Sequence, residues 1–167
     1  MSKKIDIPKL DWFERYKRLI DAAWGIMLAD EDFVYRKWGK EALAEFLKTT
    51  RPKWSGAVGK KLVEKLGLKP SVEEGIRLMA VYTQEVWGFG DPQHYEAKLE
   101  TPNKGTFTIL ACRGWEKARE HSIETRCDIP CLIEFRGLVA TLSPNIKIAS
   151  TKARPRGDDL CQYTIEM

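Results

Sequence analysis

The chain is predicted to be an α+β domain, with N-terminal helices and a four-stranded antiparallel sheet of two hairpins that has one helix packed across it. Two observations predict this class. Apolar residues recur every three or four positions up to about residue 90, which is typical of amphipathic helices. Beyond residue 93, apolar and polar residues alternate in short runs between turn-forming residues, which is typical of hairpins. We therefore expect residues 1–167 to be one domain, with a helical half at about 8–90 and a sheet-and-helix half at about 93–167.

The helical half is predicted to contain four helices. The second is expected to end before Pro52, because proline disfavours helical geometry in the residue that precedes it. The third is expected to stop at Gly67. The fourth begins at Ser71, which can form a capping box with Glu74. The expected core faces are, in order, Trp12, Tyr16, Leu19, Ala23 and Ile26; Phe33, Val34, Ala42, Phe46 and Leu47; Val58, Leu62 and Leu66; and Ile76, Met79, Ala80, Thr83 and Trp87.

The second half is predicted to hold one sheet and the helix that covers it. A helical stretch is expected at about 115–121, and the covering helix near 130–142, with Pro130 in its first turn. Both hairpins have short turns, which favours an antiparallel sheet with helices on one face. The space between that helix and the sheet is a natural place for a small-molecule cavity. The four strands are expected at 94–99, 106–111, 145–151 and 160–166.

Composition and charge argue against several classes of partner. Charged residues make up 31% of the chain in mixed patches, with a net charge of +4, whereas a nucleic-acid-binding protein concentrates its basic residues on one element. The first residues contain no apolar region of a signal peptide, and the apolar runs are too short to span a membrane. We therefore expect a cytoplasmic protein that binds a small-molecule ligand and neither nucleic acid nor a membrane, and we keep a homodimer as an open alternative.

The four cysteines are the most informative chemical groups. Cys131 is expected in the first turn of a helix, where the helix dipole stabilises a thiolate, so it is the preferred reactive residue. Cys161 shares a strand face with Tyr163, and with Cys112 it could converge near the start of that helix. Cys131 could instead be a small buried apolar residue. Zinc or another thiophilic metal held by Cys112, Cys127, Cys131 and Cys161 is a further alternative, although the step from Cys127 to Cys131 is longer than the usual zinc spacing.

Four segments of the C-terminal third carry a resemblance to known families. They are Leu110-Ala111-Cys112, Cys127-Asp128-Ile129-Pro130-Cys131, Leu142-Ser143-Pro144-Asn145-Ile146-Lys147-Ile148 and Gly157-Asp158-Asp159-Leu160-Cys161-Gln162-Tyr163-Thr164-Ile165. Together they resemble the L-2-amino-thiazoline-4-carboxylic acid hydrolase-like family and the end of the 4-vinyl-reductase-like small-molecule-binding domains. Several relatives have a further cysteine or histidine where this chain has residues 149–157, so the resemblance does not predict a complete metal site.

The resemblance implies a small-molecule-binding protein that hydrolyses a C–N bond in a small cyclic or amidine-like substrate. If the chain is an enzyme, Cys131 and Cys161 would be the catalytic residues. The ligand-binding residues would be Cys112, Arg113, Arg126 and Tyr163, with either arginine holding a substrate carboxylate. Two alternatives stay open, a non-catalytic ligand-binding or sensor domain and a cysteine-based metal or redox-responsive protein. Of the six tryptophans, Trp12 and Trp87 are expected in the core and Trp54 at a cavity entrance.

Overall fold

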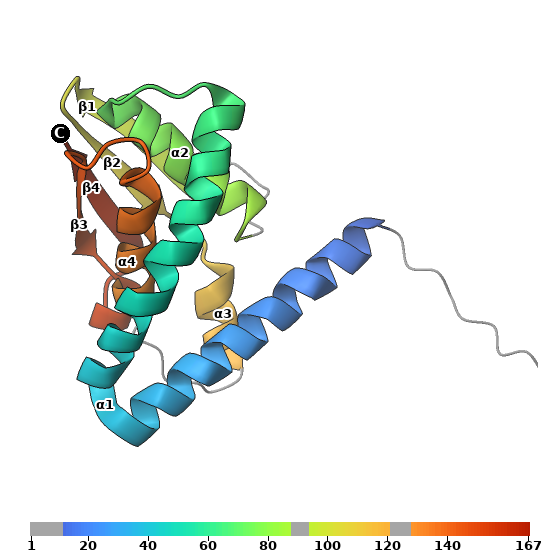
Figure 1. Ribbon diagram of the computed structural model, residues 1–167. Coiled ribbons are helices and arrows are strands. Elements are labelled where there is room, and N and C mark those ends of the chain that lie inside the picture. The colour runs from blue at the N-terminus through green and yellow to red at the C-terminus, as the bar shows by residue number, and fades with distance from the viewer. Residues whose placement is uncertain (1–11, 88–93, 121–127) are drawn as a thin grey trace, which may run out of the picture.

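The computed structural model describes residues 12–87, 94–120 and 128–167 (Figure 1). It confirms the α+β class, with a long bent helix, three shorter helices and a four-stranded antiparallel sheet. The elements are α1 (Trp12–Leu66), α2 (Val72–Glu85), β1 (Tyr95–Thr101), β2 (Lys104–Ile109), α3 (Arg113–Glu120), α4 (Asp128–Val139), β3 (Lys147–Lys152), a 3-10 turn (Arg154–Arg156) and β4 (Cys161–Glu166).

The sheet has the strand order β1-β2-β4-β3, so the two predicted hairpins join edge to edge through β2 and β4. In this register Phe107 lies opposite Tyr163, and both side chains are fully buried on one face of the sheet. The ring of Phe135 in α4 packs against them, with centroid distances of 5.9 Å to Phe107 and 5.0 Å to Tyr163. The predicted packing of a helix across one face of a single sheet is therefore confirmed.

Helix α4 lies between the sheet and the second part of α1 (Figure 1). The two helices approach closely because Gly137 has no side chain at their crossing. A Cβ atom at Gly137 would lie 2.6 Å from Ser55 Oγ and 2.7 Å from the Cα of Pro52. This close contact fixes the second part of α1 against the core.

The course of α1 differs from the prediction. The chain bends at Gly39, which has a φ of 86°, a conformation that glycine adopts readily and other residues rarely do. Beyond this bend it remains helical through Pro52 as far as Leu66. A proline inside a helix removes one backbone hydrogen bond. Here the burial of Leu47 and Leu62 on either side of Pro52 outweighs that cost. We call residues 12–38 the arm and residues 40–66 the second limb.

The end of the second limb and the start of α2 were predicted correctly. Gly67 adopts a φ of 64° directly after the second limb, as expected for a residue that ends a helix. Ser71 caps α2, because its hydroxyl accepts a hydrogen bond of 3.1 Å from the backbone N–H of Glu74. On the predicted core face of α2, Ile76, Met79, Thr83 and Trp87 are buried, and Ala80 is partly buried.

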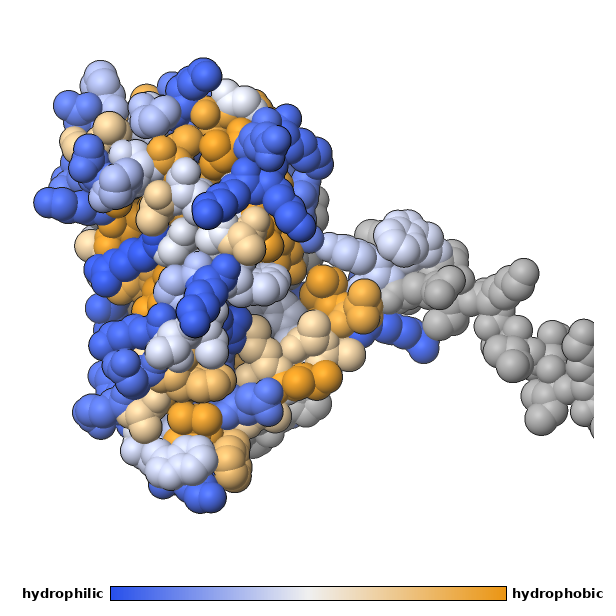
Figure 2. Space-filling model, viewed as in Figure 1, coloured by the Kyte–Doolittle hydropathy of each residue, from blue (hydrophilic) through white to orange (hydrophobic). Residues whose placement is uncertain are grey.

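The predicted core face of the first helix is largely wrong, since Tyr16 alone among its five residues is half-buried. Trp12 is 78% exposed, and Leu19 and Ile26 are each 67% exposed, because the arm points away from the body of the molecule (Figures 1 and 2). The arm contacts the body through its other side, where Trp24 packs against the core and Leu28 is buried. Spacing identifies an apolar face and not what covers it. Phe33, Phe46 and Leu66, also predicted to be core residues, are exposed as well.

No helix in the described part of the chain has both the length and the apolar character of a membrane span.

Candidate ligand-binding site

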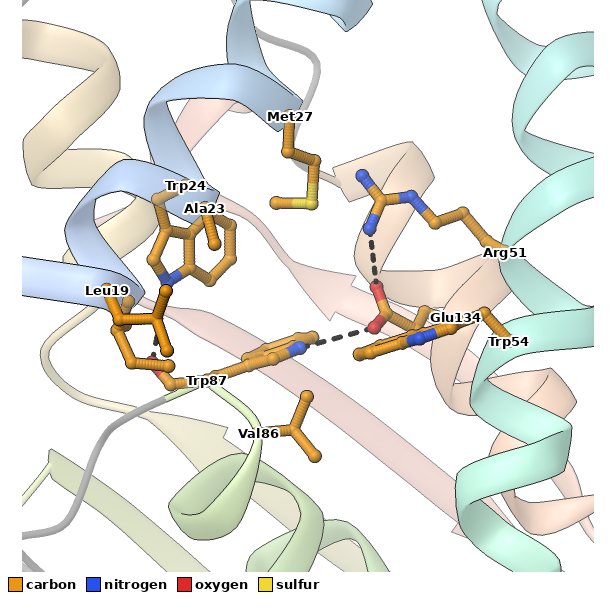
Figure 3. A pocket seen from close by; sticks show the side chains of 10 residues that line it. Leu19, Ala23, Trp24, Met27, Arg51, Trp54, Val86, Trp87 and Glu134 are labelled. Carbon is orange, nitrogen blue, oxygen red and sulfur yellow. Dashed lines mark hydrogen bonds and ion pairs between the residues drawn. The ribbon is translucent and has the colours of Figure 1, made fainter. Parts of the chain in front are cut away.

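A cavity of about 360 Å³ lies where the arm, the second limb, the end of α2 and α4 meet (Figure 3). Its size falls within the range of small-molecule sites. Most of its wall is hydrophobic, and two charged side chains, Arg51 and Glu134, contribute the polar part. The lining residues are Leu19, Ile20, Ala23, Trp24, Met27, Arg51, Trp54, Val86, Trp87 and Glu134.

Tryptophans form three parts of the wall, and hydrogen bonds and ring contacts hold two of them in place. The indole N–H of Trp24 donates to the carbonyl oxygen of Trp87 over 3.4 Å, and the two rings meet edge to face at 6.1 Å. Trp87 also packs on Phe135, with ring centroids 4.9 Å apart. Trp54, expected at an entrance, lines the cavity and is 48% exposed. The cavity therefore has aromatic walls that its surroundings pre-organise.

Glu134 provides the polar end of the cavity. Its Oε1 accepts a hydrogen bond from Tyr82 Oη and another, of 3.3 Å, from Trp87 Nε1. Its Oε2 lies 3.5 Å from Nη1 of Arg51, and Arg51 forms a second ion pair with Glu31. The sequence places Arg51 in the second limb and Glu31 in the arm, so this group of charges joins the two parts of α1 to α4.

The charges in this group do not balance, since two buried carboxylates face one guanidinium. Burial raises the pKa of Glu134 and of Glu31, and for Glu31 the nearby charge of Glu134 raises it further. Arg51 opposes both shifts. Burial acts to lower the pKa of Arg51, but Glu31 and Glu134 outweigh it, so the guanidinium remains charged. The group has no positive charge to spare for an anionic ligand.

A second cavity, of about 210 Å³, adjoins the first and shares Met27, Arg51 and Trp54 with it. Glu31 and Asp30 line this second cavity, together with Phe46 and Thr50. Arg51 therefore lies between two cavities, one mostly hydrophobic and one partly acidic.

The predicted cysteine cluster forms around Tyr163, away from the main cavity. Cys112 and Cys161 are buried and Cys131 is partly buried, and within the described residues none of the three forms a disulfide. Burial, followed by the proximity of Cys131, Cys161 and Cys112, raises the pKa of Tyr163. Burial also raises the pKa of the Cys112 thiol to about 11. None of these four residues lines the cavity that contains Glu134.

Cys131 occupies the position that the sequence predicted for it. It lies in the first turn of α4, as expected, and one turn before Glu134. The charge of Cys131 is also one of the causes that raise the pKa of Arg51. Cys131 therefore links the Tyr163 cluster with Arg51 at the polar end of the cavity.

The remaining predicted site residues have other positions. Arg113 is bound to Asp21 through an ion pair of 2.7 Å that attaches α3 to the arm. Arg126 and Cys127 lie outside the described residues. Within the ranges that the structure describes, no three or more His, Cys, Asp or Glu side chains are placed to hold a metal ion.

Sequence reasoning missed the charged group of Arg51, Glu31 and Glu134. The available signal was Glu134 itself, a carboxylate inside the predicted apolar helix near 130–142. A charged residue among apolar neighbours on a buried helix needs a partner. The sequence could not indicate that the partner would come from the turn before Pro52.

Comparison with known proteins identifies the fold alone. No protein-family model matches the chain, and no curated protein matches it. Among solved structures, the chain is similar to trafficking protein particle complex subunit 3 from Naegleria fowleri, a structure in which that protein is covalently bound to palmitic acid. The TM-score is 0.57 with 11% sequence identity, over 92% of this chain and 95% of that one.

Proposed function

We propose that the protein binds a small, predominantly apolar molecule in the cavity lined by Trp24, Trp54 and Trp87. The observation that carries this proposal is the combination of a mostly hydrophobic cavity with one polar end, where Glu134 and Arg51 meet. Ligand sites typically have this composition, because apolar walls provide binding energy and a few polar groups orient the ligand.

The charge of the polar end selects among polar groups on the ligand. A ligand carboxylate would add a third negative charge beside Glu31 and Glu134, with only Arg51 to balance them. An amine or amidine would instead be attracted to these carboxylates and to the faces of the tryptophan rings. The preferred ligand is therefore an apolar molecule with a cationic or hydrogen-bond-donating group.

The structural similarity supports the apolar part of this proposal. The trafficking protein particle complex subunit 3 of Naegleria fowleri is covalently bound to palmitic acid, so a protein of similar fold carries a long apolar chain. This supports an apolar ligand for the present chain and does not specify one.

Hydrolysis of a C–N bond in an amidine-like ligand is a second proposal, favoured by the position of Cys131 near Arg51 and one turn before Glu134. The Cys131 sulfur would add to the amidine carbon and the amine would leave after taking up a proton. Water would then attack the resulting thioimidate and release an amide together with the regenerated thiol. Because the cavity is lined by other residues, binding does not require this thiol. The two proposals therefore predict different effects of replacing Cys131.

The direct test is titration of the full chain with hexylamine, hexanol and hexanoate, followed by tryptophan fluorescence. We expect hexylamine to bind more tightly than hexanoate, because only the carboxylate opposes Glu134 and Glu31. Ala23→Phe, which fills the cavity, should abolish the response, whereas Ala57→Phe on the exposed side of the second limb should not. Equal binding to Ala23→Phe and to the unaltered protein would contradict the proposed site.

A further inference from the structure

Four large apolar side chains of the arm are exposed at intervals of seven residues. Their exposed fractions are 78% for Trp12, 67% for Leu19, 67% for Ile26 and 56% for Phe33. Seven residues make almost two helical turns, so the four side chains follow one line along the helix. Figure 2 shows hydrophobic side chains along this part of the surface. We call Trp12, Leu19, Ile26 and Phe33 the apolar stripe.

The apolar stripe is long and continuous compared with ordinary surface hydrophobics. At 1.5 Å per residue, it extends for about 31 Å along the arm. Single exposed apolar side chains need no explanation, but a contiguous row of large ones marks an interaction surface. The spacing put Trp12, Leu19 and Ile26 in the predicted core of the first helix and Phe33 in that of the second, yet each of the four is more than half exposed. Leu19 in addition borders the main cavity.

We infer that the apolar stripe is a homodimer interface in which the arm of one copy packs antiparallel against the arm of a second copy. The stripe is symmetrical about the point between residues 22 and 23. In an antiparallel pair Leu19 of each copy therefore lies at the level of Ile26 of the other, and Trp12 at the level of Phe33. This inference does not depend on the proposed function.

The charges on the arm favour this occupant and this direction. Residues 12–25 carry three basic and two acidic side chains, a net charge of +1, whereas residues 26–38 carry three acidic and two basic ones, a net charge of −1. Antiparallel packing brings the basic half of each copy beside the acidic half of the other, and parallel packing would align like charges. Ala22 and Ala29, both exposed beside the stripe, leave room for a close approach of the two helices.

The first test is the mass of the full chain by light scattering after size exclusion, over a range of concentrations. We expect a dimer that dissociates on dilution. Ile26→Glu and Phe33→Glu should each raise the dissociation constant at least about tenfold, because the first places a charge near the centre of the apolar contact and the second places one against Trp12 of the other copy. Leu66→Glu is the matched control, since Leu66 is 42% exposed at the far end of the second limb and lies off the stripe. It should leave the dimer unchanged.

Unchanged circular dichroism would show that Ile26→Glu and Phe33→Glu fold normally, as expected for exposed positions. A chain that is monomeric at all concentrations would overturn the inference, as would a dimer insensitive to both substitutions. Monomers that sediment with phosphatidylcholine vesicles would show that the stripe meets a membrane surface instead, and this result also overturns it.

Cross-linking tests the direction. In the antiparallel dimer, position 22 of one copy lies beside position 22 of the other, so Ala22→Cys should form a disulfide-linked dimer under mild oxidation. Phe33→Cys should not, because each copy of position 33 faces position 12 of the other. The unaltered chain controls for its natural thiols. Efficient linkage of Phe33→Cys without linkage of Ala22→Cys would overturn the antiparallel arrangement.

Discussion

The guanidinium of Arg51 lies 3.5 Å from the carboxylate of Glu134 and so connects the second limb of α1 to α4 at the polar end of the cavity. The same guanidinium pairs with Glu31 of the arm. One cation thus holds three helical segments together, and it does so in a setting where Arg51, Glu31 and Glu134 are all largely removed from water.

Replacing Arg51 with methionine tests this relationship. The substitution keeps a long side chain but leaves two buried carboxylates without a counter-charge, which typically costs about 3–5 kcal/mol. We expect a loss of this size in the free energy of unfolding, measured with urea. Lys48→Met is the control, because the exposed pair of Lys48 and Glu45 should contribute less than about 1 kcal/mol. Equal losses for both variants would show that the buried ion pairs do not stabilise the fold.

The two glutamates also predict how stability depends on pH. Because the pKa values of Glu31 and Glu134 are raised in the folded protein, the folded state binds more protons than the unfolded state above the ordinary glutamate range. The contribution of these groups to the free energy of unfolding therefore falls as the pH rises through that window. Urea unfolding from about pH 5 to about pH 8 should show this decrease. Glu31→Gln should make the dependence flatter, and an unchanged slope would contradict the shifted pKa of Glu31.

Local signals were enough to predict some parts of the fold. The capping of α2 by Ser71 and the end of the second limb at Gly67 depend only on neighbouring residues, so the sequence contains the necessary information. The sheet was predictable for a similar reason, because each hairpin is a short stretch of alternating residues. Its assembly from two hairpins follows from the general preference for joining antiparallel pairs edge to edge.

The parts that could not be predicted depend on contacts between distant segments. Pro52 remains inside a helix because the helix is buried on both sides of it, at Leu47 and at Leu62, which outweighs a local preference. Strand alternation predicted the cysteine cluster around Tyr163. The pairing of Arg51 with Glu134 could not be predicted in this way, because it joins segments from opposite halves of the chain. Spacing alone could not show that the apolar face of the arm would be exposed.

The crossing of α1 and α4 should be sensitive to the smallest increase in side-chain size. Gly137→Ala would bring a methyl group within 2.7 Å of the Cα of Pro52, and backbone atoms cannot rotate away as a side chain can. We expect a loss of about 1–3 kcal/mol in the free energy of unfolding. Gly56→Ala is the matched control, because its methyl group would make ordinary contacts at 3.8 Å or more. It should be neutral or stabilising, and a destabilisation equal to that of Gly137→Ala would rule out close packing as the cause.

The thiols should differ in reactivity. Cys112 is buried and its pKa is about 11, so only a small fraction of it is thiolate near neutral pH. During alkylation of the folded protein at about pH 8, we expect the more accessible Cys131 to be modified before Cys112. Peptide mass spectrometry at successive times gives the order, and unfolding in urea should make both residues reactive. Early modification of Cys112 would show that its site opens readily to solvent.

Serine substitutions at Cys131 and Cys161 separate binding from hydrolysis. Cys161 is buried, so Cys161→Ser places a hydroxyl in the core and should lower the free energy of unfolding by about 1 kcal/mol or more. Cys131 is partly buried and should tolerate serine with a smaller loss.

If the protein only binds its ligand, both variants should keep the affinity of the unaltered chain for hexylamine, because neither residue lines the cavity. If it hydrolyses a C–N bond through Cys131, amine release from an amidine substrate should disappear in Cys131→Ser while its melting temperature changes little. Full amine release by Cys131→Ser would exclude this thiol as the nucleophile, and loss of hexylamine binding in either variant would contradict the separation of the cysteine cluster from the cavity.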